Sequence, residues 1–259
     1  MPVPLYTVET CPNPAYQLKW AYTLFWHQPP KSADWLDGLK KANEPDGIRI
    51  LQHEFTSSSI SQFLVSTKPE VVPQTMIQRI KGRLQTQLRP LFPNAFQRNY
   101  ALRSIGWVDR ITVNNYVAGQ LQHHPLADPR AISQLEKYQF ADDRVKLETP
   151  SRTSHGIYWY NLHLVLVNAE RYRSIDDGRL SRLLLMIKSV AQKKQQSLSR
   201  VGILPDHCHL TLRAPLDVSP AEVALSYLNN LAYALGMRPE FRFSYYVGTF
   251  GEYTTKAIR

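Results

Sequence analysis

The chain has little cysteine and no long apolar segment. Its two cysteines, Cys11 and Cys208, form no disulfide framework, which favours a reducing cytoplasm where the protein would associate with the nucleoid. No run of about 18 apolar residues and no signal peptide is found, so we expect neither a membrane span nor export. Acidic residues are also scarce, since 21 Asp and Glu face 31 Lys and Arg and leave a formal charge of +10. This charge favours an anionic partner such as nucleic acid.

Two segments of the chain repeat each other. Asn99–Trp107 aligns with Ser244–Glu252, and the tyrosines and glycines coincide at a constant offset. Upstream, Lys68–Pro73 matches Ala214–Pro220, and each precedes a helical pattern. Internal similarity of this kind indicates a duplicated unit.

Both halves show the same predicted order, β-α-β-β-α-β, which is the split βαβ pattern of ferredoxin-like domains. The predicted fold is therefore α+β, with two such domains in one chain and antiparallel sheets packed as a pseudodimer. We place the halves at residues 1–125 and 155–259, joined by the polar stretch 126–154. The predicted opening strands are 16–26 and 157–167, and the predicted helices are 33–41, 74–91, 110–124, 179–195 and 221–235.

The second half carries His207-Cys208-His209. Side chains two apart on a strand point to the same face, so the two imidazoles would emerge together while Cys208 points into the packing. Two imidazoles on a rigid strand form a partial site for a divalent metal. The matching positions of the first half are Ile60-Ser61-Gln62, which lack imidazoles.

The first half instead continues after Gly106 into a predicted helix that carries Tyr116 and Gln120. The second half stops at Arg259, about where such a helix would begin. Each half thus holds what the other lacks.

These motifs resemble a known family, the single-tyrosine HUH transposases of small insertion sequences (IS200-like) and the related REP-associated tyrosine transposases. The resemblance is carried by Pro205-Asp206-His207-Cys208-His209, by Tyr245–Gly251, by Tyr116-Val117-Ala118-Gly119-Gln120, and by Ser66–Val71 and Arg79–Arg83. In that family the enzymes are commonly dimers, and the tyrosine helix of one subunit can complete the histidine site of the other. The resemblance implies a dimer fused head to tail and trimmed to one site, which acts as a monomeric pseudodimer on single-stranded or hairpin DNA.

The chemistry follows from the residue types. A phosphodiester is cleaved when a nucleophile attacks phosphorus in line while a cation stabilises the phosphate oxygens. We assign Tyr116 as the nucleophile, which would form a 5′-phosphotyrosine that a 3′-hydroxyl can reverse, and His207 and His209 as metal ligands. Gln120 lies one helical turn from Tyr116 and is the expected third ligand. Mixed nitrogen and oxygen ligation suits Mn²⁺, or Mg²⁺ with several waters.

Some alternatives stay open at this point. His124 shares the helix face of Tyr116 and is another candidate ligand, and Asp206 is expected to shape the turn or to hydrogen-bond a ligand histidine. The chain is also compatible with a domesticated, non-cleaving DNA-binding protein, or with a site assembled between two chains. Composition does not exclude an RNA substrate.

The expected DNA contacts are basic side chains and exposed aromatic rings. Cations would contact phosphates, and rings would stack on unpaired bases. The predicted cations are Arg79, Lys81, Arg83, Arg103, Lys188 and Lys193, and the candidate rings are Trp20, Tyr22, Trp26 and Trp107.

Overall fold

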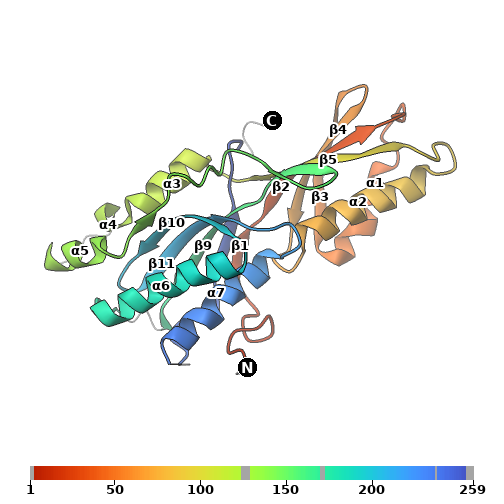
Figure 1. Ribbon diagram of the computed structural model, residues 1–259. Coiled ribbons are helices and arrows are strands. Elements are labelled where there is room, and N and C mark those ends of the chain that lie inside the picture. The colour runs from red at the N-terminus through yellow and green to blue at the C-terminus, as the bar shows by residue number, and fades with distance from the viewer. Residues whose placement is uncertain (1–2, 124–128, 170–172, 237, 255–259) are drawn as a thin grey trace.

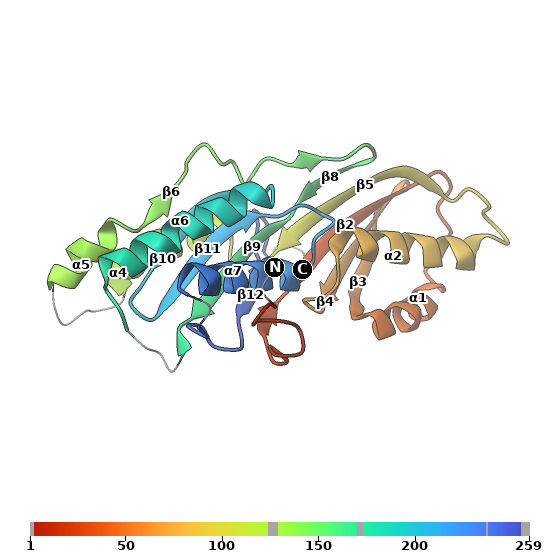
Figure 2. The same cartoon turned by 60° about the horizontal axis from the view of Figure 1, so that its bottom comes forward.

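The computed structural model describes residues 3–123, 129–169, 173–236 and 238–254, and His124 lies outside them. Two six-stranded, mostly antiparallel sheets lie along one elongated molecule (Figures 1 and 2). The first sheet has the order β3-β4-β2-β5-β8-β7 and the second β1-β12-β9-β11-β10-β6. The predicted α+β class with two ferredoxin-like domains is confirmed.

The first sheet consists of β2 (Lys19–Trp26), β3 (Ile48–Ser57), β4 (Ile60–Thr67), β5 (Phe96–Ile105), β7 (Ser151–Arg152) and β8 (Gly156–Trp159). One of its faces is covered by α1 (Leu36–Asn43), which leads into the short 3₁₀ helix Glu44–Asp46, and by α2 (Pro73–Leu88). The second sheet consists of β1 (Ala15–Gln17), β6 (Phe140–Ala141), β9 (Asn161–Val167), β10 (Ser197–Ile203), β11 (His207–Arg213) and β12 (Tyr246–Thr249). Its covering helices are α6 (Asp177–Lys193) and α7 (Pro220–Ala234).

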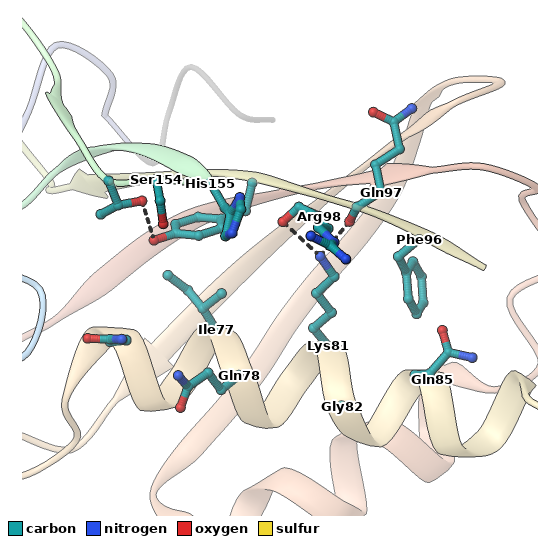
Figure 3. A pocket seen from close by; sticks show the side chains of 13 residues that line it. Ile77, Gln78, Lys81, Gly82, Gln85, Phe96, Gln97, Arg98, Ser154 and His155 are labelled. Atoms are coloured by element: carbon teal, nitrogen blue, oxygen red, sulfur yellow. Dashed lines mark hydrogen bonds between the residues drawn. The ribbon is translucent and has the colours of Figure 1, made fainter. Parts of the chain in front are cut away.

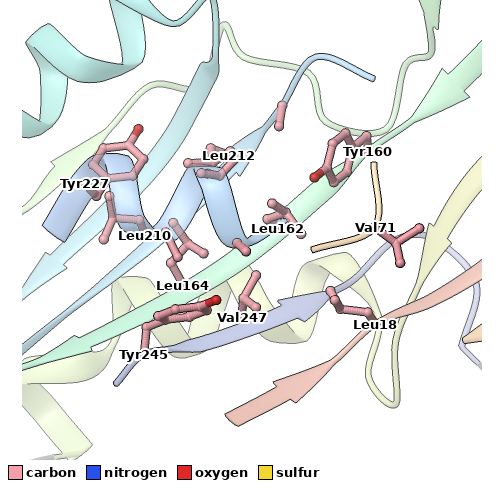
Figure 4. Packing of buried hydrophobic residues seen from close by; sticks show 14 of the residues in the cluster. Leu18, Val71, Tyr160, Leu162, Leu164, Leu210, Leu212, Tyr227, Tyr245 and Val247 are labelled. Atoms are coloured by element: carbon pink, nitrogen blue, oxygen red, sulfur yellow. The ribbon is translucent and has the colours of Figure 1, made fainter. Parts of the chain in front are cut away.

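Local sequence explains where the covering helices begin. Pro73 and Pro220 occupy the first turns of α2 and α7, where a missing N–H costs no hydrogen bond. Ser219 and Glu222 form a reciprocal capping box at the start of α7. Alternate residues of the strands then fill the core beneath, as Leu162, Leu164, Leu210 and Val247 do beside Tyr227 (Figure 4).

The pairing register supports the predicted alignment of the halves. The buried pairs that correspond are Tyr22 with Phe63 and Leu102 in the first sheet, and Leu164 with Leu210 and Val247 in the second. This superposition places Gln62 at the position of His209 and Ile60 at that of His207. The first sheet therefore has no imidazole pair where the second sheet has one.

The leading strand of each half pairs with the sheet of the other half. β1 immediately precedes β2 in sequence, yet it lies parallel to β12 in the second sheet. β8 immediately precedes β9, yet it lies parallel to β5 in the first sheet. This reciprocal exchange makes the two sheets one continuous structure across the centre of the molecule.

Two sequence expectations need correction. The predicted helix 110–124 is divided at Gly119 into α3 (Arg110–Ala118) and α4 (Gln120–His123). The predicted connection 126–154 contains a helix, α5 (Pro129–Glu136), and two short strands, and it buries Ala131, Leu135 and Leu147. The apolar positions of α5 follow helical spacing, but the segment is too short for that spacing to stand out in sequence.

Candidate active site

The two predicted ligand histidines lie on β11 in the second sheet. His209 pairs with Val165 on β9 and with Gly202 on β10, and its ring centroid is 5.0 Å from that of His207. Cys208 points to the opposite face and is buried, and this burial raises the pKa of its thiol to about 12. The predicted alternation is confirmed, so Cys208 is a packing residue with no thiolate to offer a metal.

Asp206 orients His207. One carboxylate oxygen of Asp206 lies 2.6 Å from His207 Nδ1. Because a carboxylate accepts hydrogen bonds, the His207 Nδ1 atom carries the proton and donates to Asp206. The lone pair of His207 is then on Nε2, which points away from the carboxylate. The expected hydrogen bond between Asp206 and His207 is present, and the ligand role of His207 stays a prediction.

A third histidine, His163, completes the cluster. His163 on β9 stacks on His209 with centroids 5.2 Å apart, and its Nε2 lies 2.9 Å from His209 Nδ1. Burial lowers the pKa of His163 to about 4, so the ring is neutral near pH 7. The Nε2 atom of a neutral His163 can accept a hydrogen bond from the Nδ1–H of His209, which leaves the Nε2 atom of His209 as the ligand atom.

His163 belongs to none of the sequence motifs, although its strand carries a signal for it. In β9 it alternates with Leu162, Leu164 and Leu166, all of which are buried in the core. Alternation alone therefore places His163 on the face opposite these leucines. Its register neighbour across the sheet was the missing information.

Tyr116 reaches this cluster from the other half of the chain. Its helix α3 contacts β10 and β11, on the face of the sheet opposite α6 and α7. The Tyr116 ring stands edge-on to His209 with centroids 5.6 Å apart, and to His163 at 6.4 Å. The side chain is 43% exposed, so a substrate from solvent can approach the phenol. The structure thus brings Tyr116 next to the histidine strand, and its role as the nucleophile stays a prediction.

Gln120 follows Tyr116 by four residues and is hydrogen-bonded to its backbone. Its Nε2 donates to the Tyr116 carbonyl at 3.1 Å, and its side chain is fully buried. The Oε1 atom has no hydrogen-bond partner among the described residues. Buried carbonyl oxygens are rarely left unsatisfied, so an oxygen in this position suits a metal ligand.

A glycine lets the tyrosine helix approach the sheet. A Cβ on Gly202 would lie 3.0 Å from the Val117 carbonyl oxygen and 3.4 Å from Gln120 Cγ. Gly202 is also the register partner of His209. The close approach at this one position brings Gln120 over the strand neighbour of a predicted ligand.

The start of α3 is fixed by its contacts with the end of the chain. Asp109 caps the helix by accepting from the Thr112 N–H at 2.7 Å, and this hydrogen bond lowers the pKa of the carboxyl. Arg110 donates to Glu252 at 2.6 Å, and its own N–H bonds the Gly251 carbonyl. The segment after β12 therefore holds the tyrosine helix in place.

The residues fit a divalent cation with mixed donors. The predicted donor set is His207, His209 and Gln120, and the unsatisfied amide oxygen of Gln120 is compatible with this prediction. Among the residues that the structure describes, no group of three or more His, Cys, Asp or Glu side chains is arranged to hold a metal. A site here therefore depends on the glutamine oxygen and on water or substrate for its remaining positions.

Three of the predicted DNA-contacting cations have intramolecular partners on the first half. Arg79 lies 3.1 Å from Asp46, and Arg83 also pairs with Asp46. Lys81 donates to the carbonyl oxygens of Gln97 and Arg98. These bonds tie α2 to its neighbours, and DNA contact by these cations stays a prediction.

The other three predicted cations differ in setting. Arg103 lies over the Trp159 ring at 3.9 Å, and Lys188 lies over Phe140 at 4.3 Å. Lys193 is in the last turn of α6, on the layer that covers the core rather than at the tyrosine. Their contact with DNA likewise stays a prediction.

The prediction that DNA bases stack on exposed rings is wrong for three of the four aromatic residues. Trp20, Tyr22 and Trp26 are each no more than 1% exposed, because they occupy the core-facing positions of β2. Burial in the first strand is the reason. Trp107 is 48% exposed and keeps the predicted role.

A pocket lies apart from the histidine cluster. It has a volume of about 580 Å³ and is bounded by α2, the start of β5 and the turn between β7 and β8 (Figure 3). Lys81 crosses its floor to the two backbone carbonyl oxygens, and burial lowers the pKa of that lysine. The side chains of the candidate site (Tyr116, Gln120, His163, His207 and His209) do not line this pocket. The candidate site is therefore identified by its residue types and their geometry, and not by a cavity.

The second half of the chain resembles a known protein family. Residues 157–259 match the family model described as Transposase IS200 like. The matched segment is the second half of the chain and contains His163, His207 and His209, so the resemblance to this family is confirmed for that half. No curated protein matches the chain.

One similar solved structure is that of a presumed transposase from Deinococcus radiodurans R1. It shares 18% identity, with a TM-score of 0.32, and the match covers 41% of this chain and 92% of that one. Within the described residues, no helix has both the length and the apolar character needed to cross a membrane.

Proposed function

We propose that this chain is a metal-dependent transposase that nicks and rejoins single-stranded DNA through Tyr116. The observation that carries the proposal is the Tyr116 ring beside His209, with centroids 5.6 Å apart although the two residues come from different halves. The family match on the histidine half supports the same class of reaction. A hairpin-flanked strand is the expected substrate, as the family resemblance implies.

Each group of the site has a defined part in the proposed reaction. The Tyr116 oxygen attacks phosphorus, the bond to the 3′ oxygen breaks, and a 5′-phosphotyrosine forms. The phenol loses its proton, and the departing 3′ oxygen gains one. A divalent cation, when bound, stabilises charge on the phosphate oxygens. His207, His209 and Gln120 would hold it, Mn²⁺ or Mg²⁺, while Asp206 and His163 keep the imidazoles oriented.

The proposed site is complete within one chain, which supports a monomeric pseudodimer. Tyr116 and Gln120 come from the first half and the histidines from the second, and the reciprocal exchange of β1 and β8 joins the halves. The fused-dimer origin is part of the proposal. It explains why the first sheet has Ile60 and Gln62 where the second has histidines.

A gel assay tests the function. Wild type is incubated with labelled single-stranded hairpin DNA taken from the flanks of the gene, with Mn²⁺ or Mg²⁺, beside Tyr116→Phe, His207→Ala and the control His27→Ala, an exposed histidine just after β2. We expect a metal-dependent covalent adduct that both site variants lose and the control keeps. Specific binding without an adduct in either metal would instead establish a non-cleaving DNA-binding protein.

A further inference from the structure

The first sheet has a face that corresponds to the catalytic face of the second sheet. In the second sheet that face carries α3 and Tyr116. In the first sheet, α1 and α2 pack on the opposite, core-facing side, against rows such as Tyr22 and Phe63. The corresponding face bears Gln62 and Ala21 at the positions of His209 and His163, so it has no metal ligands.

Cations paired with aromatic rings occupy this face and its border. Lys19 Nζ lies 4.1 Å from the centre of the Trp107 ring. The Arg103 guanidinium lies 3.9 Å from the Trp159 ring and 5.0 Å from the Tyr253 ring. Trp107 and Tyr253 are 48% and 49% exposed, so each presents much of its ring to solvent. We call these five residues the first-sheet patch.

A hollow extends the patch along the same face. Ala101 pairs with Ile157 in register, two pairs before Arg103 and Trp159 and therefore on the same face of the sheet. A pocket of about 310 Å³ opens there, lined also by Phe25, Asn99, Arg152 and the Thr153–Gly156 turn. The hollow thus combines apolar walls with a further cation.

The patch borders the tyrosine helix. Trp107 is two residues before Asp109, the cap of α3, and Tyr253 follows the segment that anchors Arg110. From Asp109 to Tyr116 the helix rises about 10 Å, at roughly 1.5 Å per residue. A strand attached to Tyr116 would therefore meet the patch within a short length.

We propose that the first-sheet patch binds an unpaired segment of the DNA strand without cleaving it. Bases would stack on Trp107 and Tyr253, and phosphates would contact Lys19 and Arg103. Sheet faces with exposed rings bind single strands this way because every base has a stacking face, which is covered by the neighbouring base pairs in a duplex. This inference rests on the proposed function for the identity of the strand. It gives the metal-free half a role in holding substrate.

Binding of a labelled single strand tests the patch. Fluorescence anisotropy is measured without metal in a Tyr116→Phe background, so that no cleavage intervenes. Trp107→Ala and Tyr253→Ala are each expected to weaken binding about fivefold to a hundredfold. Lys19→Gln removes one positive charge and no aromatic ring. It is expected to weaken binding and to reduce its salt dependence.

Tyr233→Ala is the matched control, because Tyr233 is 60% exposed on α7, away from the patch. Its affinity should equal that of the parent. Unchanged affinity in all three patch variants, or an equal loss in the control, overturns the proposal. So does tighter binding of a duplex, or of RNA with the same sequence. The adduct assay is independent of this binding test. If wild type forms the adduct and the patch variants bind DNA as the parent does, only the proposed role of the patch is refuted. If the patch variants lose binding and wild type forms no adduct, only the proposed nuclease activity is refuted.

Discussion

Replacing His163 with leucine is expected to weaken divalent metal binding about tenfold to a hundredfold. His163 Nε2 lies 2.9 Å from His209 Nδ1, so the substitution removes the hydrogen bond that selects the ligand tautomer of His209. The expected loss corresponds to roughly 1.4–2.8 kcal/mol, since each 1.4 kcal/mol is about tenfold. That size is typical of losing an orienting hydrogen bond and leaving a buried partner unsatisfied.

The measurement uses binding and not turnover. Mn²⁺ is titrated into the Tyr116→Phe protein, and the free ion is followed by electron paramagnetic resonance. His163→Gln, which keeps one amide donor and one acceptor, should lose less affinity than His163→Leu. His155→Leu is the control, because His155 lies exposed on the turn between β7 and β8. Thermal unfolding confirms that each variant is folded. Parental Mn²⁺ affinity in a folded His163→Leu protein would refute the reasoning.

Three further predictions concern other parts of the structure. Gln120→Leu should weaken Mn²⁺ binding more than His163→Leu does, because a ligand oxygen is lost, whereas Gln120→Glu should retain binding. An equal loss of Mn²⁺ affinity in Gln120→Leu and Gln120→Glu, measured by titration, would contradict the assignment of Gln120 as a ligand. Gly202→Val should lower the adduct rate about a hundredfold, because its side chain displaces the tyrosine helix; an unchanged rate would show that the close approach is unimportant. Burial lowers the pKa of His53 to about 4 from 6.5. The unfolded chain therefore binds the proton first as pH falls from 6.5 to 4, and denaturant melts should show stability decreasing over that window. His53→Phe should flatten this slope, and an unchanged slope would assign it to other groups.

The fold was largely readable from the sequence because its elements are long and periodic. The buried alternation of β2 and the proline-started helices α2 and α7 appear directly in the residue pattern. The exchange of β1 and β8 was not readable, because parallel pairing between distant segments leaves no local signal. The same alternation also explains why Trp20 and Trp26 are core residues.

The candidate site was readable where the two halves differ. Tyr116 and the His207–His209 pair each stand out as features that only one half has, and the structure brings them together. His163 was missed because a single histidine in a strand is informative only once its neighbour across the sheet is known. The salt bridges of Arg79 and Arg83 were missed for the same reason, since their partner Asp46 is distant in sequence.

The central claim is that one chain contains one complete active site. The most direct test mixes the Tyr116→Phe and His207→Ala proteins with labelled hairpin DNA and Mn²⁺, beside wild type alone. The account predicts a covalent adduct with wild type and none with the mixture, because neither variant chain holds both the tyrosine and the histidine pair. An adduct restored by mixing would show that the tyrosine of one chain serves the histidines of another, and would contradict the account.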